Sequence, residues 1–135
     1  MSPDEYQNLL LNTAPPSNHN MMVLERLYGD GNEKFIELLH AQLGMTTEVG
    51  EFTDALKRFL FYGRAIDRIN VIEELGDLVW YIGLAIHAVD TTWGEVFTVN
   101  ISKLKARYPK RFETDDALNR DLEKEREVLN KEVKS

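Results

Sequence analysis

The 135-residue sequence has no cysteine, only four prolines and no long uninterrupted run of apolar residues. Without cysteine the chain can form neither a disulfide nor a thiolate metal site. A membrane-spanning helix needs about 18 or more consecutive apolar residues, and no such run occurs. The N-terminal segment MSPDEYQNLL also lacks the basic start and apolar core of a signal peptide. We therefore expect a cytoplasmic protein with no membrane partner.

Positive charge is scarce as well. The 16 lysines and arginines are outnumbered by 23 acidic residues, so the net charge is −7. Binding of duplex nucleic acid requires a basic surface, so we do not expect duplex nucleic acid as a partner. A single nucleotide remains compatible with the charge, because metal ions can bridge acidic side chains to phosphates.

The length and composition are those of one ordinary globular domain. Hydrophobic residues make up 43% of the chain and charged residues 29%, which is typical of a protein with a packed core. We expect a single domain over residues 1–135, with its core at about 33–112.

Helical periodicity dominates two long segments, residues 33–61 and 68–89. In each of them apolar residues recur at alternating spacings of three and four. Gly44 and Gly50 lower the helix propensity of the first segment and indicate either a kink or a close approach of two helices. The apolar stripes consist of Leu38, Met45, Val49, Phe52, Leu56 and Phe59 in the first segment and Ile72, Leu75, Val79, Ile82, Ile86 and Val89 in the second.

Shorter helices are expected at both ends of the chain. A capping box that begins at Ser2 predicts a helix to about residue 11, followed by a loop over 12–20. A second box at 92–95 opens a helix that ends before Pro109. The tail, 114–135, is expected to be a charged helix whose thin leucine stripe docks on the body or on a partner. No segment shows a sustained strand period, so the fold class is all-α, a bundle of four to five helices.

Two pairs of acidic residues are the most informative local feature. Glu48 and Glu51 are three residues apart and share a helix face, as do Glu74 and Asp77. Packing of the two stripes against each other would bring all four carboxylates to the edge of one groove. An isolated pair of this kind is usually a solvated helix face. Here, however, residues 69–102 contain no lysine or arginine, whereas acids and bases alternate in the tail as on a solvated surface.

Clustered carboxylates without basic partners require a cation. Ligand sets made of oxygen alone select Mg²⁺, Mn²⁺ or Ca²⁺ over zinc. Because Mg²⁺ shares its ligands with substrate phosphates, the pattern favours a phosphate-bearing substrate with Mg²⁺, or Mn²⁺ as a substitute. A di-iron bundle would need two Glu-x-x-His motifs, and Glu37 with His40 supplies one, while neither His19 nor His87 has a glutamate three residues before it.

A basic element follows the acidic pairs. Lys103 and Arg107 are four residues apart, and Asn100 lies three residues before Lys103. Taken alone, this element is a solvated helix end that suits the helix dipole. Together with the acidic groove it would form the second half of a triphosphate site.

These motifs resemble a known family. The segments 48-EVGE-51 and 73-EELGDLVWYI-82, followed by 100-NISKLKARYPKRF-112, are similar to those of the MazG-like nucleotide pyrophosphohydrolases of the all-α NTP pyrophosphatase superfamily. The resemblance spans roughly residues 36–112. It implies metal-dependent hydrolysis of a (d)NTP to the (d)NMP and pyrophosphate with Mg²⁺ or Mn²⁺.

The resemblance also implies roles for individual residues. The metal ligands would be Glu48, Glu51, Glu74 and Asp77. The contacts to phosphate or sugar would be made by Asn100, Lys103, Arg107 and Tyr108, with Lys57 and Arg58 as weaker candidates.

Several roles stay open at this point. Glu48 or Glu51 could activate the water, with a weak preference for Glu48. His40 lies about two turns before Glu48 and is either a contact to the base or a packed histidine. Glu73 is either a supporting group of the metal site or a solvent-facing neighbour of Glu74. We expect Trp80 in the core and Asp54 in a surface pair with Arg58.

The assembly and the function each have an alternative. Members of the resembled family are usually oligomers, and two long apolar stripes suit a four-helix core that is completed by dimerisation. We therefore expect a homodimer or a homotetramer. The competing function is a non-catalytic helical module, either an oligomerisation scaffold or a nucleotide sensor, but a scaffold has no need for four unpaired acids.

Overall fold

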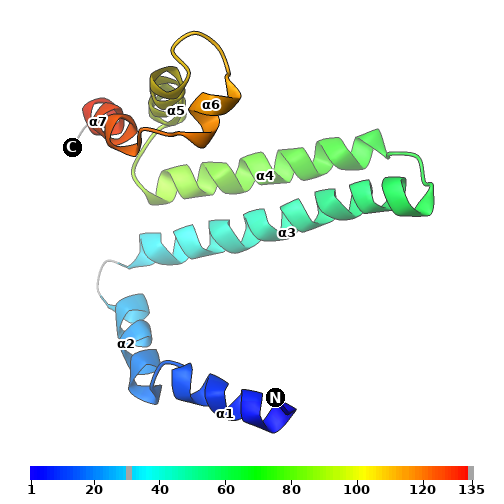
Figure 1. Cartoon of the computed structure of the whole chain (residues 1–135), viewed down its shortest axis with the longest axis vertical. Coiled ribbons are helices and arrows are strands. Elements are labelled where there is room, and N and C mark those ends of the chain that lie inside the picture. The colour runs from blue at the N-terminus through cyan, green and yellow to red at the C-terminus, as the bar shows by residue number, and fades with distance from the viewer. Residues whose placement is uncertain (30–31, 134–135) are drawn as a thin grey trace. The chain divides into compact units, whose positions relative to one another are not determined.

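The computed structural model describes residues 1–29 and 32–133 of the chain. Over these residues it contains seven helices and no strand, which confirms the all-α prediction with more helices than expected (Figure 1). The helices are α1 (Pro3–Thr13), α2 (Ser17–Tyr28), α3 (Glu33–Tyr62), α4 (Arg68–Ala88), α5 (Trp93–Arg107), α6 (Thr114–Leu118) and α7 (Leu122–Glu132). The chain divides into two compact units, residues 1–36 and residues 37–135.

The first unit contains α1, α2 and the first turn of α3. The capping box of α1 is present as predicted: the backbone N–H of Glu5 donates to Ser2 Oγ (3.1 Å), and the backbone N–H of Ser2 donates to Glu5 Oε2 (2.5 Å). The loop predicted over 12–20 is wrong at residues 12 and 13, where α1 continues, and from residue 17 onward, because α2 begins there with Pro16 as its N-cap. The proline, asparagine and serine content that suggested a loop is equally suited to a helix start, where the φ of proline is already helical.

In the second unit, α3 and α4 run antiparallel and are joined by a turn over residues 63–67 (Figure 1). Both helices end within one residue of the predicted bounds. Gly63 has a φ of +63°, a backbone conformation that glycine adopts without steric cost. Asp67 caps α4 by accepting hydrogen bonds from the backbone N–H groups of Ile69 (3.0 Å) and Asn70 (3.3 Å).

One of the two glycines of α3 marks a close approach between helices. A Cβ atom placed on Gly44 would overlap the ring of Tyr81 in α4, whereas a Cβ on Gly50 would meet nothing within 4 Å. The absence of a side chain at Gly44 therefore sets how closely α3 and α4 pack at this level.

The tail forms two helices, α6 and α7, and α7 packs against α5 (Figure 1). Glu125 of α7 is buried and pairs with Arg107 of α5, and the hydroxyl of Ser102 donates to Glu132 (3.0 Å). Docking of the tail on the body is one of the two arrangements expected from its leucine stripe.

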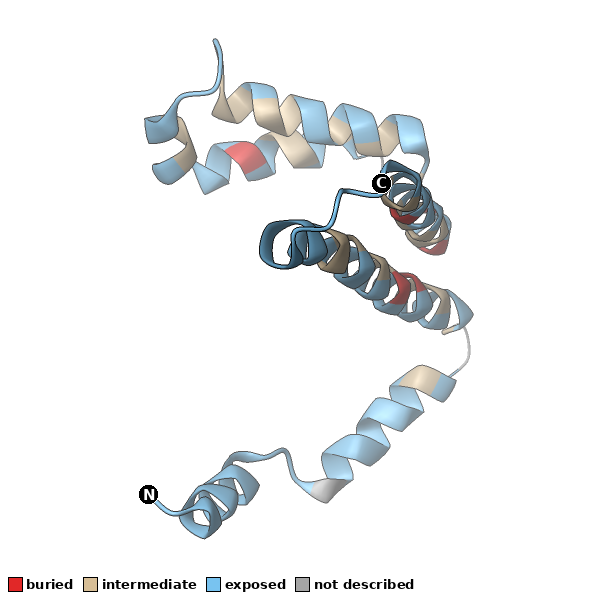
Figure 2. Ribbon diagram, turned by 90° about the vertical axis from the view of Figure 1, so that its right-hand side faces the viewer, coloured by how far each residue is buried: buried red, intermediate tan, exposed pale blue. Residues whose placement is uncertain are grey.

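The described part of the chain has very little apolar core. The buried apolar residues are Ala41, Ile86 and Ala88, and no large side chain is fully buried. Nearly all positions on the helices in Figure 2 are exposed or half-buried. Stripe residues such as Ile72 (53% exposed) and Val79 (55%) are uncovered, and the expectation that Trp80 packs in the core is wrong within this chain, since it is 60% exposed. Among the described residues, no helix is long and apolar enough to cross a membrane.

Candidate functional site

The hairpin of α3 and α4 brings three of the four predicted acidic residues together. Glu48, Glu74 and Asp77 each offer one carboxylate oxygen, and these oxygens lie within 4.8 Å of one another. Glu74 is buried, Glu48 is half-buried and Asp77 is exposed. This carboxylate group (Glu48, Glu74 and Asp77) lies at the boundary between the packed face of the hairpin and solvent, as expected for residues next to the apolar stripes.

The carboxylate group is electrostatically unfavourable on its own. Burial, followed by the negative charges of Glu51 and Asp77, raises the pKa of Glu48, while a hydrogen bond from the Thr47 hydroxyl (3.3 Å) lowers it in part. Among the residues that the structure describes, no lysine or arginine forms an ion pair with Glu48, Glu74 or Asp77. Oxygen donors in this arrangement fit a hard divalent cation such as Mg²⁺ or Mn²⁺.

Asn70 is a supporting residue that the sequence analysis missed. Its side-chain amide donates to Glu74 Oε1 at 2.6 Å, and its own backbone N–H is held by the capping carboxylate of Asp67. The helix cap thus fixes the amide, and the amide fixes the buried carboxylate. The signal was available in the sequence, because residues four apart on a helix lie next to each other.

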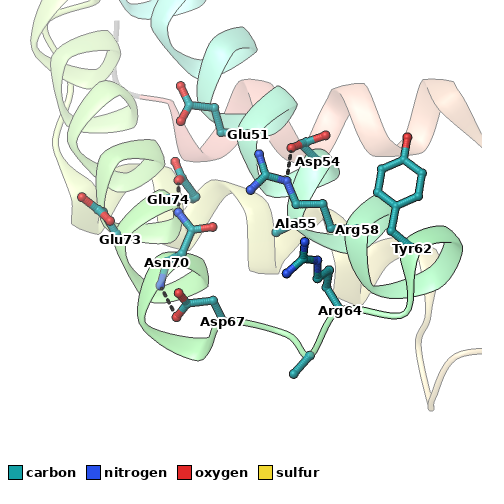
Figure 3. A pocket seen from close by; sticks show the side chains of 11 residues that line it. Glu51, Asp54, Ala55, Arg58, Tyr62, Arg64, Asp67, Asn70, Glu73 and Glu74 are labelled. Carbon is teal, nitrogen blue, oxygen red and sulfur yellow. Dashed lines mark hydrogen bonds and ion pairs between the residues drawn. The ribbon is translucent and has the colours of Figure 1, made fainter.

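Glu51 lies outside the group of three oxygens but borders the same space. It lines an open cavity of about 860 Å³ between α3 and α4, at the end of the hairpin where the chain turns (Figure 3). This hairpin cavity is lined by Glu51, Asp54, Ala55, Arg58, Tyr62, Arg64, Ala65, Asp67, Asn70, Glu73 and Glu74. It therefore joins two of the predicted acids to Arg58 of α3 and Arg64 of the turn.

The bases that follow the first acidic pair are tied to Asp54. Arg58 Nε donates to Asp54 Oδ2 at 2.6 Å, which confirms the predicted surface pair, and Lys57 pairs with the other oxygen. The hydrogen bond from Lys57 is the largest cause of the lowered pKa of Asp54, and the same bond raises the pKa of Lys57. Lys57 is therefore occupied within α3 in this structure.

The α5 candidates lie against α7. Arg107 makes a two-pronged contact to Glu125, with Nε at 2.9 Å from Oε1 and the terminal nitrogen at 2.7 Å from Oε2. Arg120 donates to the same carboxylate at 3.2 and 2.8 Å. The two guanidinium groups hold the pKa of Glu125 well below its usual range. This cluster is not apparent from the sequence, because Glu125 belongs to a segment whose alternating charges suggested a solvated face.

Of the other candidates, Asn100 and Lys103 lie beside α7, and Tyr108 lies beside Arg107. Asn100 and Lys103 line a second cavity together with Leu129 of α7. The ring of Tyr108 lies 5.2 Å from that of Phe112, and the Arg107 guanidinium lies over it at 5.7 Å.

Two histidines, His40 and His87, make contacts within the hairpin. The ring of His40 meets Tyr81 edge-on at 5.8 Å, and Tyr81 in turn meets Trp80 at 4.9 Å. His87 Nδ1 lies 3.0 Å from Glu37 Oε2, so the glutamate of the single Glu-x-x-His motif is engaged with a histidine of the other helix.

The fold and the site together define a helical protein whose hairpin carries clustered carboxylates that pair with no lysine or arginine among the described residues. The chain belongs to the MazG nucleotide pyrophosphohydrolase family, since the model of the MazG nucleotide pyrophosphohydrolase domain matches residues 38–112. This confirms the family inferred from the motifs. No curated protein and no solved structure gives a significant match. The match includes α3, α4 and α5 nearly completely and ends before α6 and α7.

Proposed function

We propose that the protein is a metal-dependent nucleoside triphosphate pyrophosphohydrolase that converts a (d)NTP to the (d)NMP and pyrophosphate. The observation that carries the proposal is the meeting of Glu48, Glu74 and Asp77 oxygens within 4.8 Å, without a basic partner, in a domain of the MazG family. Mg²⁺, or Mn²⁺ in its place, would be held by these carboxylates and by Glu51. When bound, it would neutralise phosphate charge and favour deprotonation of a water.

The chain's own residues supply the geometry. Asn70 holds Glu74 in place, and Asp77 lies one turn further along α4. Glu51 lies outside the group of three oxygens and borders the cavity, so the geometry favours Glu51 over Glu48 as the carboxylate that orients the water and accepts its proton.

From the resemblance of the segment 100–112 to the basic element of the family, we propose that Asn100 and Lys103 contact the substrate. Both line a cavity beside α7 that shares no lining residue with the hairpin cavity. Arg107, whose guanidinium is held by Glu125, serves instead to dock α7. Tyr108 supports that guanidinium with its ring.

A second copy of the chain completes the fold in this proposal. The stripes of α3 and α4 are about half exposed at Val49, Ile72 and Val79, and exposed apolar surface of this extent marks an interaction site. Two hairpins packed by these stripes would form a four-helix core. We expect a homodimer or homotetramer by light scattering coupled to size-exclusion chromatography, and a monomer at micromolar concentration would contradict the proposal.

The function is tested by measuring pyrophosphate release from the common NTPs and dNTPs with Mg²⁺, with Mn²⁺ and with EDTA. We expect release that depends on the metal and yields the monophosphate. Absence of release from every nucleotide with either metal would contradict the enzyme proposal. Binding of nucleotide without cleavage would then favour the sensor alternative.

A further inference from the structure

The hairpin cavity is chemically divided into an acidic and a basic end. Glu51 and Glu74 lie at one end, next to the carboxylate group, and Arg58 and Arg64 come from the end of α3 and the turn that follows it. In Figure 3 both guanidinium groups point into the space that Glu51 and Glu74 border. Asp54 and Asp67 also line the cavity, but Asp54 is paired with Arg58 and Asp67 caps α4. A ligand would therefore meet the carboxylates of Glu51 and Glu74 at one end and the guanidinium of Arg64 at the other.

The backbone of the turn holds Arg64 at this place. The backbone N–H of Arg64 donates to the carbonyl of Arg58 at 3.2 Å, which closes the end of α3. The positive φ of Gly63 reverses the chain just before it. In Figure 3 the exposed side chain of Arg64 is directed back toward Arg58 at the end of α3.

The two arginines differ in what they already bind. Arg58 donates through Nε to Asp54, whereas the side chain of Arg64 forms no hydrogen bond or ion pair within residues 1–29 and 32–133. Arg64 therefore retains its full set of donors for a ligand. A guanidinium group is best suited to planar, two-pronged contacts with carboxylate or phosphate oxygens.

We propose that the basic end of the hairpin cavity is the pyrophosphate subsite and that Arg64 binds the β- and γ-phosphates there. The inference rests on the proposed function and adds to it the orientation of the triphosphate in the cavity. The terminal phosphates carry the larger share of the negative charge of a triphosphate, so they occupy the guanidinium end. The α-phosphate then lies by the carboxylates, and the nucleoside extends away from the turn.

The reaction step that this orientation supports is balanced. The water oxygen bonds to the α-phosphorus, and the bond from that phosphorus to the bridging oxygen breaks. The electron pair stays on the bridging oxygen, which leaves as part of pyrophosphate, and the proton of the water goes to Glu51. Arg64 stabilises the charge that develops on the leaving pyrophosphate, and donors aimed at developing charge typically contribute about 100-fold or more to the rate.

The chain offers a matched control for the test. Arg68 is also exposed and lies four residues further on, but it does not line the cavity. Arg64→Ala and Arg64→Lys are compared with Arg68→Ala. Inhibition of turnover by pyrophosphate and by the nucleoside monophosphate is measured separately for each variant, together with kcat/KM.

We expect Arg64→Ala to lower kcat/KM by about 100-fold and to weaken inhibition by pyrophosphate at least 10-fold, with inhibition by the monophosphate unchanged. Arg64→Lys keeps the charge without the two-pronged contact. Its kcat/KM and its inhibition by pyrophosphate should therefore lie between those of the unmodified protein and Arg64→Ala. Arg68→Ala should behave like the unmodified protein. Equal weakening of both product inhibitions, or unchanged inhibition by pyrophosphate, would overturn the subsite.

A binding measurement separates this inference from the proposed function. Titration calorimetry with pyrophosphate and Mg²⁺ reports the subsite without any turnover. Pyrophosphate bound by the unmodified chain and lost in Arg64→Ala supports the subsite even if no nucleotide is cleaved. Turnover by the unmodified chain together with undiminished pyrophosphate affinity in Arg64→Ala overturns the subsite and leaves the proposed function intact.

Discussion

Two glutamates of this chain are buried to the same extent in opposite surroundings. Glu74 in α4 and Glu125 in α7 are each 4% exposed. Glu125 accepts four hydrogen bonds from two guanidinium groups. Glu74 accepts one from the Asn70 amide and lies beside two further carboxylates. A buried charge is unfavourable unless it is paired. Glu125 has two arginine partners within the chain, whereas Glu74 has no lysine or arginine partner among the described residues.

The contrast separates two regions of the sequence. Glu74 lies within the segment that matches the MazG family, and Glu125 lies beyond its end. The uncompensated carboxylate is therefore part of the family domain, where we propose that it helps to bind a cation. The compensated one belongs to a tail that holds itself onto that domain.

The sharpest way to test the contrast is to neutralise the acids at the two places. Asp77→Asn and Glu51→Gln should lower kcat/KM by more than about 100-fold, since even groups that only support metal ligands cost about 10- to 100-fold. Their helical content should stay unchanged by circular dichroism. Full activity in either variant would remove the metal-site assignment. Glu127→Gln, the same change at an exposed position of α7, serves as the control.

Neutralising Glu125 should affect stability before activity. Glu125→Gln leaves Arg107 and Arg120 without their shared carboxylate, and breaking a buried ion pair should lower the Tm by about 10 °C. Glu127→Gln on the same helix should leave the Tm within about 2 °C. Thermal unfolding followed by circular dichroism measures both. An unchanged Tm in Glu125→Gln would show that α7 is not held by this cluster.

The two glycines of α3 test whether the spacing of the hairpin matters to the carboxylate group. Gly44→Ala forces its Cβ into the Tyr81 ring and should cost about 1–3 kcal/mol. Gly50→Ala meets open space and should stabilise by about 0.5–1 kcal/mol. Because Glu48 follows Gly44 by about one helical turn, we also expect weaker Mn²⁺ binding in Gly44→Ala. Urea unfolding and metal titration check the pair, and equal effects of the two changes would contradict the close approach.

The pH dependence of stability should have opposite signs at the two sites. The pKa of Glu125 is lowered from 4.5, so its contribution is present above that value and is lost as the pH falls below it. The pKa of Glu48 is raised, so in the metal-free protein its charging costs stability as the pH rises above 4.5. The difference in Tm between the unmodified chain and Glu125→Gln should narrow from about pH 5 to about pH 3. Glu48→Gln, measured with EDTA, should remove the fall in Tm with rising pH that the charging of Glu48 causes.

Local features of the sequence were sufficient for much of the hairpin. Three-four periodicity predicted α3 and α4 to within a residue, because helix formation depends on neighbouring residues. The carboxylate group followed from the same geometry, since acids beside two facing stripes must approach each other. Its role as a metal site stays a prediction.

Other features depended on contacts that sequence spacing does not reveal. Arg107 and Glu125 are 18 residues apart and meet through tertiary docking of α7. The exposure of Trp80 could not be predicted either, because the sequence does not show which apolar side chains the rest of the same chain covers. Arg64 was missed because its place depends on the turn at Gly63, and helical periodicity does not describe turns.

In the homodimer or homotetramer that we propose, the uncovered stripes of α3 and α4 make protein concentration a variable of the folding equilibrium. When a second chain covers such a surface, association stabilises the folded form by mass action. Dilution then lowers the stability of the folded form, and the Tm should rise with protein concentration. An assay at very low enzyme concentration would consequently measure dissociation together with catalysis.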